Sequence, residues 1–186
     1  MNTVELSDLA DYAKQFAGFT PERERLLLKI GPSIIPKLPA ITDRFYEILS
    51  ELPEPAKYLA GRVDSLKRTH LHWLTSLFRG PYGLSFAEAI HHAGQVHVRV
   101  DLPIEFMAGG MTLIGDLLIA EIETLYAGDA AVRAGAHGAV NAVLGFSLIV
   151  MQEALQHSTL NQELEKFMKI TGISRPLFNN LAAAYK

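Results

Sequence analysis

The chain has 186 residues, of which 49% are hydrophobic and 20% are charged, and it contains no cysteine. This length and composition favour one folded domain and argue against disorder. The lack of cysteine excludes disulfides, thiolate metal sites, iron–sulfur clusters and haem attached through a C-x-x-C-H motif. A net charge of −3, without a basic stripe, gives no reason to expect a nucleic-acid partner.

Acidic side chains occur among the first residues, MNTVELSDLADYAKQF, where a signal peptide needs a basic start and an apolar run. The two most apolar segments are FMAGGMTLIGDLLIA and AVNAVLGFSLIVM. Both are shorter than a membrane span, and they contain Asp116 and Asn141. We therefore expect a soluble cytoplasmic protein that has no contact with a membrane.

Helix signals follow one another along the first half of the chain. Thr20 and Pro21 suit the capping and first positions of a helix that is expected to end at Gly31. Ser33 can cap a second helix, which ends where Pro53 stops it. A third begins near residue 63, carries apolar residues at spacings of three and four, and ends at residue 80.

The second half continues in the same way. Ser85 to Glu88 form a capping box, so a helix should begin there. Long apolar helices are expected up to about Tyr126 and from Asp129 to about His157, and an amphipathic piece starts near Ser174. Because no run alternates as a strand does, the sequence predicts an all-α protein of about seven or eight helices.

A lone imidazole, His97, lies between two valines on an apolar helix face. By itself this pattern favours a hydrogen-bonded core histidine. It also suits the proximal side of a haem, where a neutral imidazole nitrogen holds the iron in dry surroundings. A distal wall would then come from another helix, with Leu66 and Thr69 as candidates, and Tyr46 could add a hydroxyl.

These residues, in this order, resemble the sensor globin domain of globin-coupled sensors, a group of bacterial haem proteins with some single-domain members. The resemblance extends from about Phe19 to Gln156. The family's proximal motif, H-x-R-[IV]-x-L-P, matches 97–103 without a gap. Its distal phenylalanine–tyrosine pair matches 45–46, and the threonine of L-K-x-T matches Thr69.

The resemblance implies a globin fold of the sensor type, with an extra N-terminal helix and the other helices packed around a haem pocket. Residues 1–158 would form the sensor globin domain, and 159–186 a C-terminal helical tail or a linker to an output module. The implied cofactor is non-covalent haem b, with iron bound by His97. The implied pocket residues are Phe45, Tyr46, Leu66, Thr69, His97 and Phe106.

The function that the resemblance implies is gas sensing without enzymatic activity. The iron would bind O₂, and CO or NO as further ligands, and a homodimer through the two long C-terminal helices would carry the signal. Glycines recur in both helices and let helices approach closely, either across a two-fold axis or within one subunit.

The sequence departs from the family pattern in three places. Asp101 stands where many members have glycine, and Met107 replaces the tyrosine of an aromatic pair. His70 and His72 flank the distal region, and a distal histidine would close the sixth coordination position when no gas is bound.

Other functions use the same helices. A globin with O₂ or NO chemistry (an NO dioxygenase or a peroxidase-like enzyme) and a plain gas carrier need the same pocket. An all-α interaction module without a cofactor would explain the helices, but it would not explain the order and spacing of Tyr46, Thr69 and His97. The remaining histidines, His91 and His92 among them, are expected to be solvated or structural.

Overall fold

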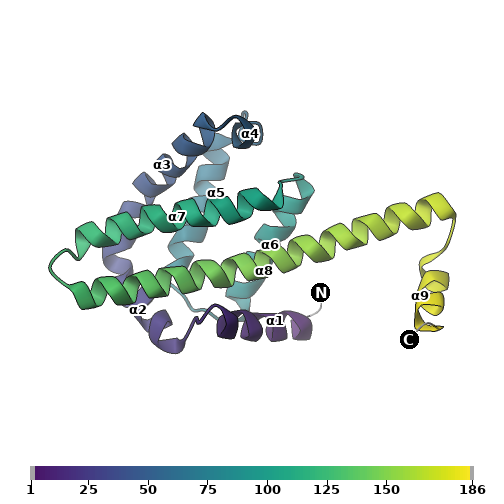
Figure 1. The fold of residues 1–186 in the computed structure, drawn as a ribbon, viewed down its shortest axis with the longest axis horizontal. Coiled ribbons are helices and arrows are strands. Elements are labelled where there is room, and N and C mark those ends of the chain that lie inside the picture. Colours follow the sequence, from purple (N-terminus) through teal and green to yellow (C-terminus); the bar gives the residue numbers. More distant parts are fainter. Residues whose placement is uncertain (1–2, 185–186) are drawn as a thin grey trace.

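The computed structural model describes residues 3–184, and every regular element in that range is a helix (Figure 1). The elements are α1 (Thr3–Phe16), α2 (Pro21–Ile34), the 3-10 turn η1 (Ile35–Lys37), α3 (Leu38–Glu51), α4 (Pro53–Ala56), α5 (Val63–Leu77), α6 (Leu84–Arg99), α7 (Ile104–Leu125), α8 (Ala130–Thr171) and α9 (Arg175–Ala184). The predicted all-α class is therefore confirmed for the described residues.

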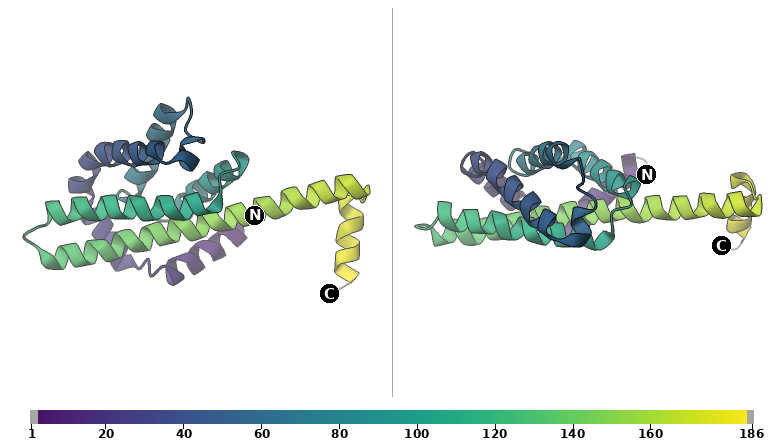
Figure 2. Two further views of the ribbon diagram at one scale, coloured as in Figure 1. Left: turned by 45° about the horizontal axis from the view of Figure 1, so that its top comes forward. Right: turned by 90° about the horizontal axis from the view of Figure 1, so that it is seen from above.

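Helices α7 and α8 form a long antiparallel pair through the centre of the molecule (Figure 1). Helix α6 packs on α8, and α3 packs on both α5 and α7. As a result, α3, α5 and α6 lie on the same side of the α7–α8 pair (Figure 2). The N-terminal helix α1 packs on α6 and α8, and α2 packs on α8 and α7.

An aromatic cluster fixes the start of α6 against α8. The rings of Phe86 and Phe146 stack with centroids 5.8 Å apart, and Tyr82 meets Phe86 edge-on at 5.3 Å. The buried Tyr82 hydroxyl donates a hydrogen bond of 2.8 Å to the Leu77 carbonyl. Phe19 completes the cluster against Phe146 and Tyr82. Large aromatic surfaces of this kind dominate the free energy of core packing.

Gly94 is where α6 and α8 approach most closely. A Cβ at this position would lie 2.7 Å from the Met151 carbonyl oxygen and 2.9 Å from the Ala154 Cβ. Those distances are shorter than van der Waals contact, so only glycine fits without a shift of one helix. Since His97 follows one turn later on α6, the Gly94 contact also fixes the position of that histidine.

We expect Gly94→Ala to lower the free energy of unfolding of the apoprotein by about 1–3 kcal/mol, because overpacking forces α6 away from α8. Gly109→Ala on α7 is the matched control, since a Cβ there has no neighbour within 4 Å. Alanine at Gly109 should instead stabilise the helix by about 1 kcal/mol. Urea unfolding followed by circular dichroism measures both changes, and equal effects at the two positions would contradict the packing argument.

Two of the expected boundaries in the first half of the chain are wrong. Thr20 caps α2 as predicted, accepting a hydrogen bond of 3.4 Å from the Arg23 N–H. The helix, however, continues through Gly31, where a Cβ would lie 2.6 Å from the Phe78 carbonyl oxygen. Gly31 therefore serves close packing and does not end the helix. Ser33 lies inside α2, and α3 begins only after the 3-10 turn.

The predicted capping box and the predicted end of the last long helix are also wrong. Helix α6 begins at Leu84 with Gly83 in the capping position, and no side chain caps it. Helix α8 runs on to Thr171 and ends at Gly172, which adopts a left-handed φ of 72°. Because the boundary expected at residue 158 falls inside this continuous helix, the division into domain and tail stays a prediction.

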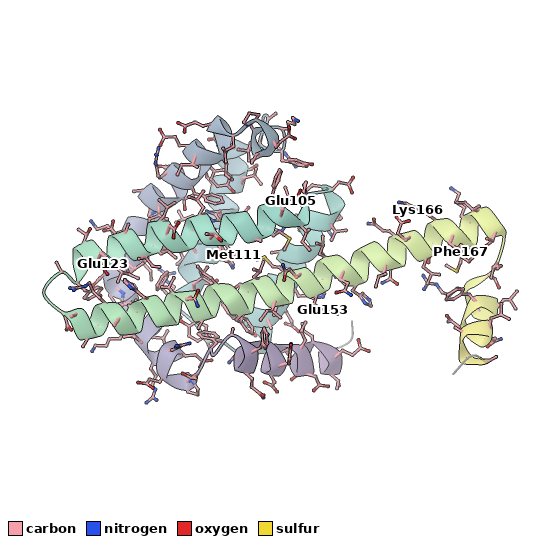
Figure 3. The ribbon with its side chains drawn as sticks, viewed as in Figure 1. Glu105, Met111, Glu123, Glu153, Lys166 and Phe167 are labelled. Carbon is pink, nitrogen blue, oxygen red and sulfur yellow. The ribbon has the colours of Figure 1, made fainter. Side chains whose placement is uncertain are left out.

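Helix α8 is long and apolar enough to cross a membrane by length and composition alone. More than half of its apolar stretch is buried against the other helices, as in the core helix of a globular protein. Its last turns, which carry Lys166 and Phe167, extend beyond the other helices (Figure 3). After α8 the chain turns, α9 points away from the axis of α8 (Figure 1), and Arg175 pairs with Glu165.

The glycines of α7 and α8 face neighbours within the subunit. A Cβ added to any of five of them would contact a side chain of the same chain, at distances between 2.9 and 3.7 Å. Gly109 is the one glycine of α7 and α8 where an added Cβ would have no neighbour within 4 Å among the described residues. The five glycines with neighbours therefore support packing within one subunit, the second of the two expectations, and only Gly109 leaves space for a second helix. The five contacts are Gly110 with Phe45, Gly115 with Leu144, Gly135 with Leu26, Gly138 with Arg23 and Gly145 with Ala17.

Candidate functional site

Tyr46 and Phe45 lie near the end of α3, on the face that the helix buries. Both side chains are 7% exposed, and their rings meet edge-on with centroids 5.2 Å apart. Burial raises the pKa of Tyr46 to about 12, so its phenol is neutral at physiological pH. The Tyr46 backbone carbonyl accepts a hydrogen bond of 2.6 Å from the Ser50 hydroxyl, and the neutral phenol is a hydrogen-bond donor.

His70 on α5 packs against these two rings. Its imidazole stacks on Phe45 with centroids 4.7 Å apart and meets Tyr46 edge-on at 5.6 Å. Trp73, one turn along the helix, lies 5.6 Å away. Both ring nitrogens are buried without a hydrogen-bond partner, and burial lowers the pKa of His70 to about 4.

Thr69, predicted to line the distal side, lies on the exposed face of α5. Its hydroxyl donates a hydrogen bond of 3.1 Å to the Ser65 carbonyl of the same helix. Tyr46 is instead contacted by His70, the residue that follows Thr69 in the sequence. Leu66, one turn before His70, is partly buried and packs against the core, as predicted.

His97 lies in the last turn of α6, where it is partly buried. Its Nδ1 is buried, and no hydrogen bond of normal geometry reaches it. Burial lowers the pKa of His97, and the nearby backbone carbonyl of Ala93 acts in the opposite direction. The ring is thus held in its neutral form, whose lone pair is the one that binds a metal.

The turn after His97 explains one departure from the family pattern. The backbone N–H of Leu102 donates to the His97 carbonyl at 3.0 Å, and Asp101 between them adopts a positive φ of 51°. Glycine adopts this conformation without strain, whereas aspartate is one of the few other residues that tolerate it. The backbone therefore keeps the glycine conformation although the sequence has aspartate.

Helices α5 and α6, which carry His70 and His97, belong to different packing units. Helix α5 packs on α3 and α6 packs on α8, and these units stand on the same side of α7 (Figure 2). No group of three or more histidine, aspartate or glutamate side chains in the described part of the chain can hold a bare metal ion. A metal between the two units would have to bring most of its own ligands, as the iron of a haem does.

Comparison with known proteins agrees with this geometry. The family model described as Protoglobin matches residues 6–161. The chain belongs to the protoglobin family. This membership makes it a globin by fold and implies haem binding.

Two solved structures are similar to this protoglobin. The globin domain of the Geobacter sulfurreducens globin-coupled sensor is 27% identical, with a TM-score of 0.71 over 77% of this chain and 95% of that chain. The ferric globin domain of E. coli DosC is 17% identical, with a TM-score of 0.65 over 78% of this chain and 99% of that chain. Both similarities show the globin fold. No curated protein sequence matches this chain.

The residues of this protoglobin fit a haem. An imidazole with a buried, unpartnered Nδ1 lies on α6, and a second buried imidazole without partners lies on α5. Buried polar atoms normally have a hydrogen-bond partner, so unpartnered nitrogens on these two helices are compatible with a bound haem. Phe106, predicted to line the pocket, is partly buried on α7 and meets Tyr58 edge-on at 5.7 Å. Met107, which replaces the family's tyrosine, is buried in the core.

The other histidines lie elsewhere. His91 is buried, which fits the structural and not the solvated alternative, and His92 is exposed. His137 contacts Glu123 at 3.0 Å near the turn between α7 and α8 (Figure 3). His157 is exposed. Lys67 on α5 pairs with Asp43 on α3 at 2.8 Å.

Sequence reasoning missed two polar groups near the site. The Thr42 hydroxyl and the Trp73 indole nitrogen are buried without hydrogen-bond partners. Thr42 lies one turn before Tyr46, and Trp73 lies one turn after His70. A helical projection of α3 would have placed Thr42 on the buried face, but a lone threonine carries no signal that distinguishes a site from a core position.

Proposed function

We propose that this protoglobin is a haem-based gas sensor of the cytoplasm that binds haem b non-covalently through His97. The haem, held by His97, would supply an iron that binds O₂, CO or NO. The observation that carries this proposal is the His70 imidazole on α5, whose two ring nitrogens are buried without a hydrogen-bond partner and which meets the buried Tyr46 ring of α3 edge-on.

His97 would hold the cofactor through Nε2. Its neutral ring supplies the lone pair, and the backbone carbonyl of Ala93 near the ring is the kind of partner that orients a metal-bound imidazole. Phe45, Leu66 and Phe106 would supply apolar walls, which keep water away and raise the strength of any hydrogen bond inside.

Tyr46 would discriminate between gases. A neutral phenol donates a hydrogen bond, and bound O₂ accepts it more strongly than the less polar CO does. Because the surroundings are dry, a single donor is worth about 1–3 kcal/mol. This difference gives the site a preference that depends on the polarity of the ligand.

Haem reconstitution tests the proposal. The purified chain mixed with haemin should acquire a Soret band and bind one haem per chain, and the reduced protein should bind CO reversibly. A chain that gains no Soret band after reconstitution contradicts the proposal outright. Rapid consumption of NO or peroxide by the reconstituted protein would favour the alternative of an O₂- or NO-reactive enzyme.

We also propose that the sensor is a homodimer through α7 and α8. The two helices run side by side, and Ile149 on α8 is only partly buried within the subunit. Gly109 on α7 leaves open space where a second helix can approach. Signals from the haem would reach this surface through α6, which packs directly on α8.

Ile149→Glu is expected to shift the protein from dimer toward monomer, because the interface would bury an unpaired charge. Leu144 is unsuitable for this test, since it is 5% exposed inside the subunit and a charge there would unfold the chain. Val96→Glu, on the exposed side of α6, is the matched control and should leave the assembly unchanged. Sedimentation velocity measures the result. A wild-type chain that is already monomeric at micromolar concentration contradicts the dimer.

A further inference from the structure

Helix α1 presents an apolar stripe to solvent on its outer side, while it packs on α6 and α8 with the other. Val4, Tyr12 and Phe16 are exposed, the last to 74%, and the rings of Tyr12 and Phe16 stack with centroids 5.7 Å apart. Residues four positions apart lie on one side of a helix, so these three share a side with Asp8. Such a stripe is typical of a helix that binds in an apolar groove.

Helix α9 is a second helix with an unpartnered apolar side. Leu177 and Leu181, four positions apart, are both about half exposed. Among residues 3–184, α9 has no extensive contact with another helix, and the pair of Arg175 with Glu165 joins it to the end of α8. Because an isolated helix of ten residues is marginal in water, α9 needs a partner that covers its apolar side.

The bend between α8 and α9 forms an open hollow with an apolar floor. Met168 is buried there, and Ile173 is partly buried. Charged side chains surround these two residues, so the hollow suits an apolar side chain that has opposite charges beside it. The hollow is lined by Glu165, Lys166, Met168, Lys169, Ile173 and Arg175.

The outer side of α1 and the hollow carry complementary charges. Helix α1 has three carboxylates and one lysine, Lys14, which pairs with Glu24 of α2 at 2.6 Å. Asp8 and Asp11 are exposed and have no ion pair with any described residue. Lys169, exposed at the hollow, likewise has no ion pair within the described chain. Complementary charges of this kind steer association and fix the orientation of two surfaces.

The two apolar sides do not meet within one chain, because α9 lies at the far end of α8, away from α1 (Figure 1, Figure 2). We propose that the α8–α9 bend of one copy receives the outer side of α1 of a second copy, with Asp8 toward Lys169. In a two-fold pair each copy supplies both surfaces, so both contacts form together and the assembly closes. The contact is separate from the α7–α8 pairing and does not require haem.

Cross-linking of single cysteines tests the exchange, because the chain has no cysteine of its own. Gln15→Cys on α1 and Asn180→Cys on α9 change exposed positions beside the two apolar sides. A mixture of these full-chain variants, treated with a short bismaleimide, should form a covalent dimer at least about tenfold faster than either variant alone, since contact raises the local thiol concentration. Gln15→Cys mixed with His72→Cys, an exposed position on α5, is the matched control and should react at the background rate.

Further substitutions in the cysteine variants identify the contact. Phe16→Glu in the Gln15→Cys chain should lower the rate to that of the control pair, because a charge replaces the apolar contact. Leu52→Glu, at an exposed position between α3 and α4, should leave the rate unchanged. Asp8→Lys in the same chain should slow the reaction about two- to fivefold, the effect of an exposed ion pair, and Lys169→Glu in the Asn180→Cys chain should restore it.

Three results would overturn the exchange. Equal rates for the mixed pair and the control pair would leave α9 to a different partner. A chain with both cysteines that closes into a cross-linked monomer would show that α9 packs on its own α1, whereas the exchange gives a covalent dimer. No restoration by Lys169→Glu would remove Lys169 from the contact with Asp8. Haem binding is tested separately by reconstitution, so none of these results changes that proposal.

Discussion

Replacing His97 by alanine is expected to abolish stable haem binding. The variant loses the only proposed bond between the protein and the iron on the α6 side, and apolar contacts alone must retain the cofactor. Changes in the hydrogen bonding around a metal ligand already cost about 10–100-fold in affinity, so loss of the ligand itself should cost at least about 100-fold. Transfer of haem to apomyoglobin measures the loss as a rate, and the Soret absorbance measures it as a stoichiometry.

His92→Ala is the matched control, because His92 is on the same helix and exposed. It should retain the wild-type haem content. His97→Gly opens a space that free imidazole can enter, and added imidazole should restore the spectrum if the defect is the missing ligand. An unchanged stoichiometry and spectrum in His97→Ala would show that a different side chain binds the iron.

The sequence was sufficient for the fold class because the apolar periodicity of each helix is local. Thr20 with Pro21 marks the start of α2, and the hydroxyl caps the helix as its position predicts. Asp129 likewise starts α8, accepting a hydrogen bond of 3.0 Å from the Val132 N–H. Such signals involve residues within one turn, so they can be recognised without knowledge of the tertiary structure.

The errors arose where a distant contact decides the conformation. Glycine is typical of a helix end, but Gly31 lies inside α2. Glycine is needed there because a Cβ would lie 2.6 Å from the carbonyl oxygen of Phe78, which is 47 positions later in the chain. Ser85 has a good capping sequence, but α6 starts one residue earlier, at Leu84. At Gly31 tertiary packing overrides a local preference of about 1 kcal/mol, whereas the start of α6 differs from the predicted one by a single residue.

The distal site shows how helical phase and motif can disagree. The L-K-x-T motif pointed to Thr69, whereas the spacing of apolar residues along α5 places His70 on the inner face with Leu66 and Leu74. The contacts of His70 with Phe45 and Tyr46 agree with the spacing. The helical periodicity of this chain determines which side chains of α5 face inward. A motif transfers a role from other proteins, and neighbouring residues of a helix point in directions about 100° apart, so a shift of one position changes which residue can have that role.

Tyr46→Phe is expected to raise the rate of O₂ dissociation by roughly tenfold, because about 1.4 kcal/mol of hydrogen bonding corresponds to a factor of ten. The substitution removes only the hydroxyl, so the edge-on contacts of the ring with Phe45 and His70 persist. Dissociation of CO, which gains less from a donor, should change much less. Stopped-flow mixing of the ferrous gas complexes measures both rates.

Thr69→Val provides the comparison that identifies the donor. The Thr69 hydroxyl is already bound to the Ser65 carbonyl on an exposed face, so its removal should leave the dissociation of O₂ within about twofold of the wild type. A larger effect in Thr69→Val than in Tyr46→Phe would restore the role that the motif suggests for the threonine. Equal acceleration of O₂ and CO in Tyr46→Phe would mean that the change widened the pocket. No acceleration in either variant would exclude both hydroxyls and leave His70, the remaining polar side chain in contact with Tyr46, as the group that stabilises bound O₂.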